Sequence, residues 1–219
     1  MGYPQAKRSV HLAYATVNAA DGTPFSSRTM NGLGLGKIRE TVEARVAPDI
    51  RKRYGSGRLE PEVIELIQDF ALAVIKYGFL RVDAPVSIRF DLDEWLRLDG
   101  DSALSLLHLY AKSKKILVEN GNAPDPVTLS LVLQTEKELL EHLRKYPSLS
   151  LTAASRYRPS LVTQYLYELA GFYTRFLAEA RNSDTQRSLT HSHLALVEAT
   201  AAVLHNGLTI LGIRIPRGL

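Results

Sequence analysis

The stretch that decides the fold is "HLALVEATAAVLHNGLTILGIRIP", which runs from His193 to Pro216 near the C-terminus. Its apolar residues recur at alternating steps of three and four, the spacing that places side chains on one side of an α-helix. These seam residues are Leu194, Val197, Ala201, Leu204, Leu208 and Leu211. The pattern predicts a long helix with a narrow apolar seam, and Gly207 within it predicts close packing of a neighbour.

Helical periodicity covers most of the remaining chain. It predicts an amphipathic helix over residues 37–53, a core-facing helix that begins near Pro61, and a capped helix within residues 100–117. The segment Glu119–Val127 contains two prolines, two asparagines and a glycine, so we expect a linker there. Everything after the linker is predicted to be helical, including one helix marked by Val132, Leu139 and Leu143 and one marked by Tyr165, Leu169, Phe172 and Phe176.

Strand signals occur at two places. Residues Val10–Asn18 are rich in Val, Tyr and Thr and precede an Asp-Gly turn signal, so we expect a strand followed by a loop. "VSIRF" (Val86–Phe90) alternates apolar and polar residues over a short length. The chain is therefore predicted to be mainly α, with a short α/β part near its N-terminus.

Composition limits the available chemistry. The chain has 219 residues, 45% of them hydrophobic, which is enough for a sizeable core. It has no cysteine, which excludes disulfides, thiolate zinc sites and a cysteine nucleophile. The net charge of +4 permits RNA binding without arguing for it. No membrane span or signal peptide is recognisable, so we expect a cytoplasmic protein without a membrane partner.

Three segments resemble one protein family. "YLYELAGFYTRFLAEAR" (Tyr165–Arg181) and "VLHNGLTILGI" (Val203–Ile213) resemble the DALR anticodon-binding domain of arginyl-tRNA synthetases. "IRFDLDEWL" (Ile88–Leu96) resembles the family's junction before that domain. The pattern from His11 to Arg28, which includes "DGTPFSSR", resembles the end of a class I catalytic domain with its KMSKS-like loop. The segments follow the family's order and cover nearly the whole chain.

The resemblance implies a domain division. Residues 1–58 are expected to be a remnant of the catalytic domain, and residues 59–219 a DALR-type helical bundle. Ser26 or Ser27, depending on the register, stands where the family's loop usually carries a lysine, while Arg28 remains, so these three residues are interpreted as the remnant of an ATP loop. No HIGH-like motif is present. We therefore expect a truncated or paralogous protein with no catalytic residues, no metal and no cofactor, with ATP involved only in a complete synthetase.

The strongest candidate for RNA binding is "SRYRPSLVTQYLYELAGFYTR" (Ser155–Arg175). Its arginines can contact phosphates, and its tyrosines offer rings on which unpaired anticodon bases can stack. The predicted tRNA-binding residues are Arg156, Tyr157, Arg158, Tyr165, Tyr167, Tyr173 and Arg175. The resemblance implies that the partner is a tRNA for arginine.

Two further clusters are interpreted as structural. Asp91, Asp93 and Glu94 could form an acid–base pair or a metal site, but the resemblance makes them a junction that caps the next helix. His191 and His193 lie about 200° apart on a helix and have no third ligand nearby, so we expect ordinary helix-start or surface residues.

Two other functions stay open at this point. The chain could be a fragment or subunit of an active arginine–tRNA ligase, an ATP-dependent class I enzyme. It could also be a protein-interaction module that docks onto a full-length synthetase or another protein through the seam of the last helix. The leading hypothesis is a tRNA-binding protein that does not aminoacylate alone.

Overall fold

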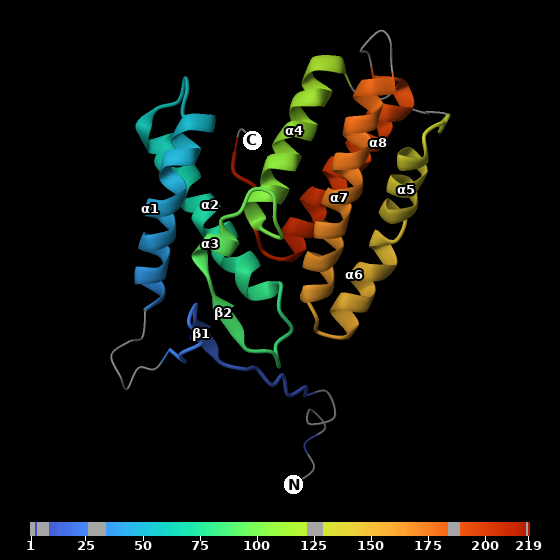
Figure 1. The fold of residues 1–219 in the computed structure, drawn as a ribbon. Helices are drawn as coiled ribbons and strands as arrows, with labels where there is room; N and C mark the ends of the chain where they lie inside the picture. Colours follow the sequence, from blue (N-terminus) through green and yellow to red (C-terminus); the bar gives the residue numbers. More distant parts are fainter. Residues whose placement is uncertain (1–2, 4–8, 26–33, 122–128, 184–188, 218) are drawn as a thin grey trace.

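The computed structural model describes the chain except for residues 1–2, 4–8, 26–33, 122–128, 184–188 and 218. The described residues form a mainly helical molecule with a small parallel sheet, as predicted (Figure 1). The elements in chain order are β1 (Val17–Ala19), α1 (Leu35–Tyr54), α2 (Glu60–Leu80), β2 (Ile88–Phe90), α3 (Leu92–Trp95), α4 (Ala103–Asn120), α5 (Gln134–Leu143), α6 (Tyr146–Ser155), α7 (Ser160–Ser183) and α8 (His191–Ile210).

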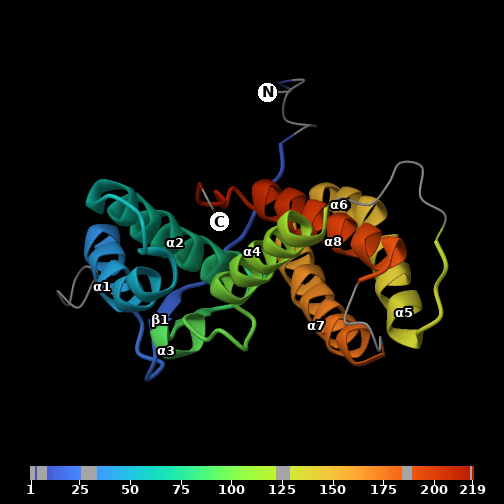
Figure 2. The same cartoon turned by 90° about the horizontal axis from the view of Figure 1, so that it is seen from above.

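Helices α1 and α2 pack side by side (Figure 2). The buried stripe of α1 consists of Ile38, Val42, Val46 and Ile50, which share one face because they recur every four residues. α2 begins with Pro61 in its first turn, where the missing N–H has no helical partner to lose. α2 packs against both α1 and α4, which makes it the helix that links the two. The helices predicted over 37–53 and after Pro61 are thus confirmed.

The sheet joins two distant segments. β1 runs parallel to β2, with Val17 opposite Ile88 and Ala19 opposite Phe90. The strand predicted over Val10–Asn18 is wrong for most of its length, since β1 covers only Val17–Ala19. The Ala15 N–H still donates to the Ala84 carbonyl at 2.8 Å, but the chain opposite turns there, with the Val86 N–H donating to the Asp83 carbonyl, so the ladder ends. The strand expected within "VSIRF" is confirmed for its last three residues.

A tight corner follows β2. The Asp91 carboxylate accepts hydrogen bonds from the backbone N–H groups of Asp93 at 3.1 Å and Glu94 at 3.2 Å, which caps α3 as expected. Trp95 is buried at the end of α3 against the ring of Phe90, 4.9 Å away between centroids. The Trp95 ring also packs directly against α2 at Gly78. Only glycine fits there, because a Cβ at this position would lie 2.4 Å from the ring.

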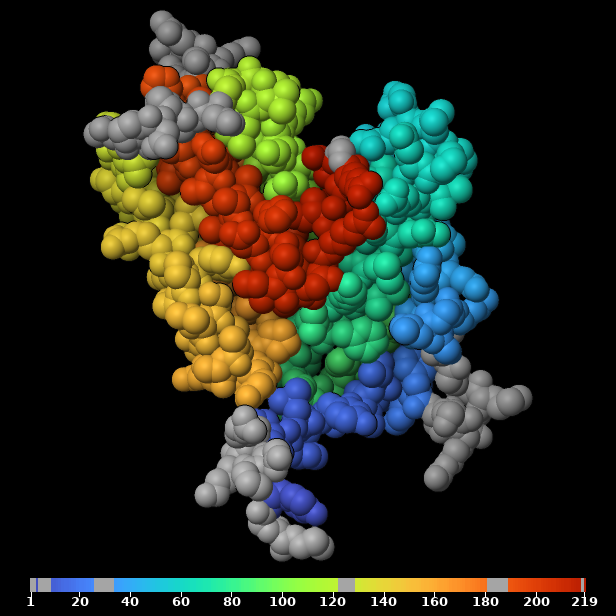
Figure 3. Space-filling model, turned by 180° about the vertical axis from the view of Figure 1, so that it is seen from behind, coloured from blue at the N-terminus to red at the C-terminus, as the bar shows by residue number. Residues whose placement is uncertain are grey.

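Helix α8 occupies the centre of the second half. It packs against α4, α5 and α7, and every residue of the predicted seam is buried. A Cβ on Gly207 would lie 2.7 Å from a Leu166 methyl group, which confirms the close packing expected at this glycine. The hypothesis that this seam docks onto another protein is wrong, because helices of the same chain already cover it. Figure 3 shows the outer side of α8 and the C-terminal segment, where Arg214 reaches Glu65 of α2 at 3.1 Å.

The region between the linker and α7 differs from the prediction. Val132 does not belong to a helix; it is 79% exposed, and α5 begins only after Leu133. The cause is Glu136, whose carboxylate accepts hydrogen bonds from the N–H groups of Val132 and Leu133, both at 2.7 Å. The helical state of residues 146–155 agrees with the prediction, but α6 was not distinguished as a separate helix, since its sequence lacks a clear apolar period. Most of the expected linker, residues 122–128, lies outside the described residues.

Contacts cross the proposed domain boundary at residue 58. α1 packs on α2, and β1 pairs with β2, so elements from both sides share one core. The division into residues 1–58 and 59–219 stays a prediction.

Candidate nucleic-acid interface

Two of the predicted RNA-binding tyrosines lie inside the protein. Tyr165 stacks on His142 with 4.4 Å between ring centroids, and its hydroxyl donates to the His142 carbonyl at 3.0 Å. Burial raises the pKa of the Tyr165 hydroxyl. Tyr173 is fully buried, and a hydrogen bond of 2.8 Å joins its hydroxyl to that of Ser113. The expectation that these two tyrosines stack on bases is therefore corrected, because neither ring offers a free face.

Tyr167 and Arg175 lie on the outer side of α7. The Tyr167 side chain is 46% exposed. The Arg175 guanidinium sits over the half-buried ring of Phe172, 4.7 Å from its centroid, and lies 3.6 Å from the Glu138 carboxylate. An arginine placed over an aromatic ring can still present its planar guanidinium to a second group.

These residues border a groove of about 650 Å³ between α4 and α7, which we call the α4–α7 groove. Helix α4 contributes Ser105, His108, Leu109 and Lys112. Helix α7 contributes Tyr167, Glu168, Ala170, Gly171, Phe172, Thr174 and Arg175, and the loop before α4 contributes Leu98, Asp99 and Gly100. Residues three, four and seven apart on a helix share one face, so the two helices present facing stripes to the groove.

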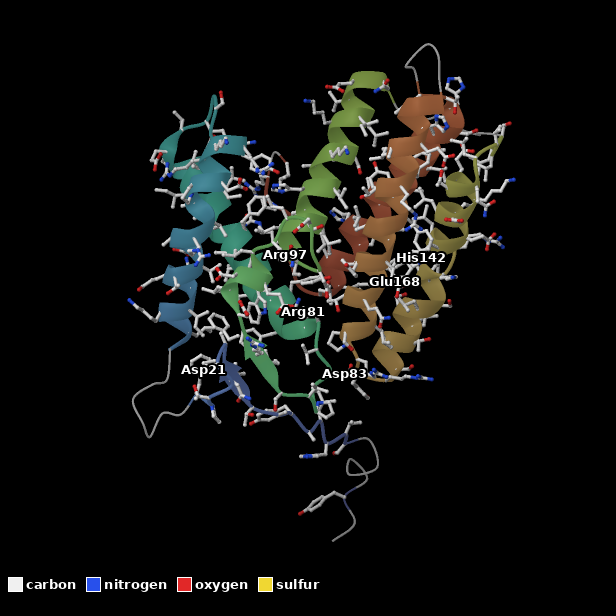
Figure 4. The ribbon with its side chains drawn as sticks, viewed as in Figure 1. Asp21, Arg81, Asp83, Arg97, His142 and Glu168 are labelled. Carbon is white, nitrogen blue, oxygen red and sulfur yellow. The ribbon has the colours of Figure 1, made fainter. Side chains whose placement is uncertain are left out.

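The groove has an acidic end and a basic end. Both helices run in the same direction (Figure 1), so Asp99 and Glu168 lie near the end where the lining stripes begin. Figure 4 shows Glu168 on α7. Arg97 donates a hydrogen bond to the Asp99 carboxylate at 3.2 Å. Lys112 and Arg175 line the other end. Cations at one end suit a phosphate, and carboxylates at the other accept hydrogen bonds from amino groups of bases.

His108 connects the groove to α1. Its Nδ1 atom lies 3.2 Å from the Tyr54 hydroxyl, and its Nε2 atom lies 3.9 Å from an oxygen of Asp49. Burial lowers the pKa of the His108 imidazole, so this ring is neutral near pH 7. The positive charge of the groove therefore comes from Lys112 and Arg175.

The remaining predicted residues lie in a second region. Arg156, Tyr157 and Arg158 form the turn between α6 and α7 and border a depression of about 460 Å³. Arg158 donates from both Nε and Nη2 to the carboxylate of Asp83, which lowers the pKa of that carboxyl group. Tyr157 has a left-handed backbone with φ of +53° and is 54% exposed.

The sequence-predicted cluster is thus divided between two surfaces. Arg156 and Tyr157 are exposed in the turn before α7. The first residue of that helix, Ser160, already lies about 12 Å along the helix axis from Glu168, at a rise of about 1.5 Å per residue. Tyr167 and Arg175 border the α4–α7 groove. The predicted ATP-loop residues Ser26, Ser27 and Arg28 lie outside the described part of the chain.

The histidine pair has a structural place. His193 is buried and its Nε2 atom lies 2.8 Å from a Glu136 carboxylate oxygen, while its Nδ1 accepts a hydrogen bond from the N–H of Thr190 at 3.2 Å. His191 is exposed at the first position of α8. Within the described ranges, no three His, Cys, Asp or Glu residues converge as a metal site would require.

Sequence reasoning missed most of the groove. Ser105, His108, Leu109 and Lys112 recur at helical spacing, a signal that marks one face of α4. Glu168, Gly171 and Phe172 follow the same spacing before Arg175. The period of each helix was visible, but nothing in the sequence indicated that the two faces meet.

The α4–α7 groove combines an exposed aromatic side chain with cations, the side-chain types on which unpaired bases stack in RNA-binding proteins. The family model of the DALR anticodon-binding domain matches residues 106–219, and the chain belongs to this family. The match includes α7, α8 and most of the α4 face of the groove. The resemblance noted in the sequence is thereby confirmed.

Similar proteins agree with this membership. The chain is 32% identical to an arginine–tRNA ligase of Bdellovibrio bacteriovorus over 99% of its own length and 38% of the ligase. It is 30% identical to a ligase of the same name from Streptomyces coelicolor, over 95% of the chain and 36% of the ligase. The chain thus spans well under half the length of these relatives.

Solved structures share the fold. The arginyl-tRNA synthetase of Thermus thermophilus superposes with a TM-score of 0.79 at 22% identity, over 95% of this chain and 35% of that one. The arginyl-tRNA synthetase of Plasmodium falciparum gives a TM-score of 0.73 at 19% identity, over 83% of this chain and 33% of that one. In the described part of this chain, no helix has the length and apolar character needed to cross a bilayer.

Proposed function

We propose that this protein binds the anticodon region of a tRNA, specifically one for arginine, through the α4–α7 groove, and that it does not aminoacylate tRNA by itself. The observation that carries the proposal is the coincidence of the groove with the region matched to an anticodon-binding domain. The relatives named arginine–tRNA ligase support arginine tRNA as the partner. A cytoplasmic location fits this partner.

The chemistry of the groove supports unpaired bases as its ligand. Tyr167 provides a partly exposed ring, and Arg175 lies over the ring of Phe172 as a cation–π pair. Base stacking on such groups tolerates every base, whereas phosphate contacts at Lys112 and Arg175 position the strand. Discrimination among tRNAs then rests on acceptors such as Glu168 and Asp99.

The test is a gel-shift titration at moderate salt with arginine tRNA, a tRNA for another amino acid, and duplex RNA. We expect the tightest binding for arginine tRNA, because a groove that reads bases discriminates where phosphate contacts do not. Equal, weak and steeply salt-dependent binding to all three RNAs would show that the protein has no tRNA specificity.

A second candidate function is participation in an active arginine–tRNA ligase, since the relatives with that name align along nearly the whole chain. Arginine-dependent exchange of pyrophosphate into ATP separates the two. Exchange by the isolated chain would overturn the non-enzymatic proposal. No exchange by the chain, together with specific tRNA binding, is the outcome we expect.

A further inference from the structure

Three glycines lie in the long helices beyond the first turn, and they fall into two groups; Gly36, in the first turn of α1, also has open space around it. Gly78 on α2 and Gly207 on α8 are dictated by packing, because a Cβ at either position would come within 3.0 Å of Trp95 or Leu166. Gly171, in the middle of α7, has no such neighbour: a Cβ there would meet nothing within 4 Å. The fold therefore does not require glycine at this position.

Glycine at an exposed position inside a helix weakens the helix. It has more backbone freedom to lose on folding than any other residue, and alanine is the most favourable replacement. Gly171 is exposed, and α7 continues for three turns on either side of it. Its presence lowers stability with no packing gain, so a different reason is needed.

The surroundings of Gly171 supply that reason. It lies in the α4–α7 groove, with Tyr167 one turn before it and Arg175 one turn after it on the same helix. Each turn rises about 5.4 Å, which leaves a stretch of bare backbone between the tyrosine ring and the arginine that covers Phe172. A flat ring can approach this backbone more closely than it could approach a helix surface covered with side chains.

We propose that Gly171 is a positioning residue for RNA: an unpaired nucleobase lies against the bare backbone of α7 at Gly171, flanked by Tyr167 and by the Arg175–Phe172 pair. This inference rests on the proposed binding of RNA in the groove and adds where the base sits. A methyl group at position 171 would occupy the contact surface and hold the base away from both flanking groups.

The test uses the full chain with Gly171→Ala, measured for thermal stability and for binding to arginine tRNA. We expect Tm to rise by about 2 °C, because alanine favours the helix. We expect the affinity for the tRNA to fall by about fivefold, because one stacking contact is lost. If Gly171 has no role in RNA binding, Tm will rise and the affinity for the tRNA will stay the same.

Asn206→Ala is the matched control. Asn206 is exposed inside α8 and does not border the groove, so this change should raise Tm in the same way and leave RNA binding unaltered. A larger side chain, in Gly171→Leu, should weaken binding further than alanine does.

The two proposals fail differently. If the unmodified protein binds arginine tRNA and Gly171→Ala binds it equally well, the position assigned to the base is wrong and the proposed function stands. If the unmodified protein shows no specific binding to arginine tRNA, both proposals are wrong.

Discussion

Tyr167 and Tyr173 belong to the same helix and yet have opposite roles in the molecule. Tyr173 is fully buried against α4, where it shares a hydrogen bond with Ser113. Tyr167 is 46% exposed and borders the α4–α7 groove. The two positions point about 120° apart around the axis of α7, since each residue turns the helix by about 100°. One aromatic residue stabilises the bundle while the other is available to a ligand.

This difference shows that aromatic content alone does not define an RNA-binding surface. The buried side of α7 carries Leu166, Leu169, Tyr173 and Phe176 at steps of three and four. Tyr167 falls outside that stripe, and so does Arg175. Substitutions on the two sides should therefore separate stability from binding.

The largest expected effect is on stability. Tyr173→Ala removes a fully buried ring and leaves a cavity, which typically costs about 3–5 kcal/mol in the free energy of unfolding. Urea denaturation followed by circular dichroism measures this loss. Tyr167→Ala should cost less than about 1 kcal/mol, and equal losses for the two variants would contradict the assignment of the two faces.

The next effect is on RNA affinity. Tyr167→Ala should weaken binding to arginine tRNA by about tenfold through the loss of one stacked base, with Tm nearly unchanged. Tyr167→Phe retains the ring and should bind like the unmodified protein. Tyr157→Ala, at the α6–α7 turn, provides the comparison: if it alone weakens binding, the RNA site lies at that turn and the groove assignment is wrong.

A smaller effect is expected for the cation at the basic end of the groove. Arg175→Ala should reduce affinity about threefold to fivefold and lower the slope of log K against log salt by about 1, as loss of one phosphate contact does. The affinity is measured by titration at several salt concentrations. Arg39→Ala, which removes an arginine paired with Glu43 on α1, should leave the slope unchanged.

The smallest effect concerns acid stability. Burial lowers the pKa of His142, so the unfolded chain binds a proton more readily than the folded protein does. Stability should therefore fall as the pH drops below about 6.5, the pKa of an unperturbed histidine, by at most about 1.4 kcal/mol per pH unit. His142→Gln can keep a side-chain N–H near the Tyr165 carbonyl and removes the titration.

Urea denaturation at pH 7 and pH 5.5 compares the two proteins. The unmodified protein should lose more stability than His142→Gln between these values. A difference between the two that does not change with pH would rule out His142 as a source of the acid sensitivity.

Much of the helical framework could be predicted because local sequence determines it. The seam of α8, the apolar stripe of α1 and the cap formed by Ser102 before α4 depend on residues within a few turns of each other. Predictions were poorer where pairing with a distant segment decides the outcome. Residues 10–16 have strand-forming side chains, but the segment opposite Ala15 forms a turn before β2 begins, so no strand is assigned there.

The site was less predictable than the fold for the same reason. The sequence pointed to α7 as the candidate RNA-binding helix, which stays a prediction, but it could not separate Tyr165 and Tyr173 from Tyr167 without knowing which side meets α4 and α5. The α4–α7 groove is formed by helices with some forty residues between them, so its lining is a product of tertiary packing. The sequence alone could not distinguish Gly171 from a packing glycine, because only the structure shows that a Cβ there would meet nothing within 4 Å.

The pairing of β1 with β2 and of α1 with α2 has a practical consequence for dissecting the protein. A chain shortened to begin at residue 59 would uncover the apolar face of α2 and leave β2 with an open edge. Exposed apolar strips and unpaired strand edges both promote self-association. We therefore expect the solubility of a chain that begins at residue 59 to depend on β1 and α1, which lie outside the family match of residues 106–219.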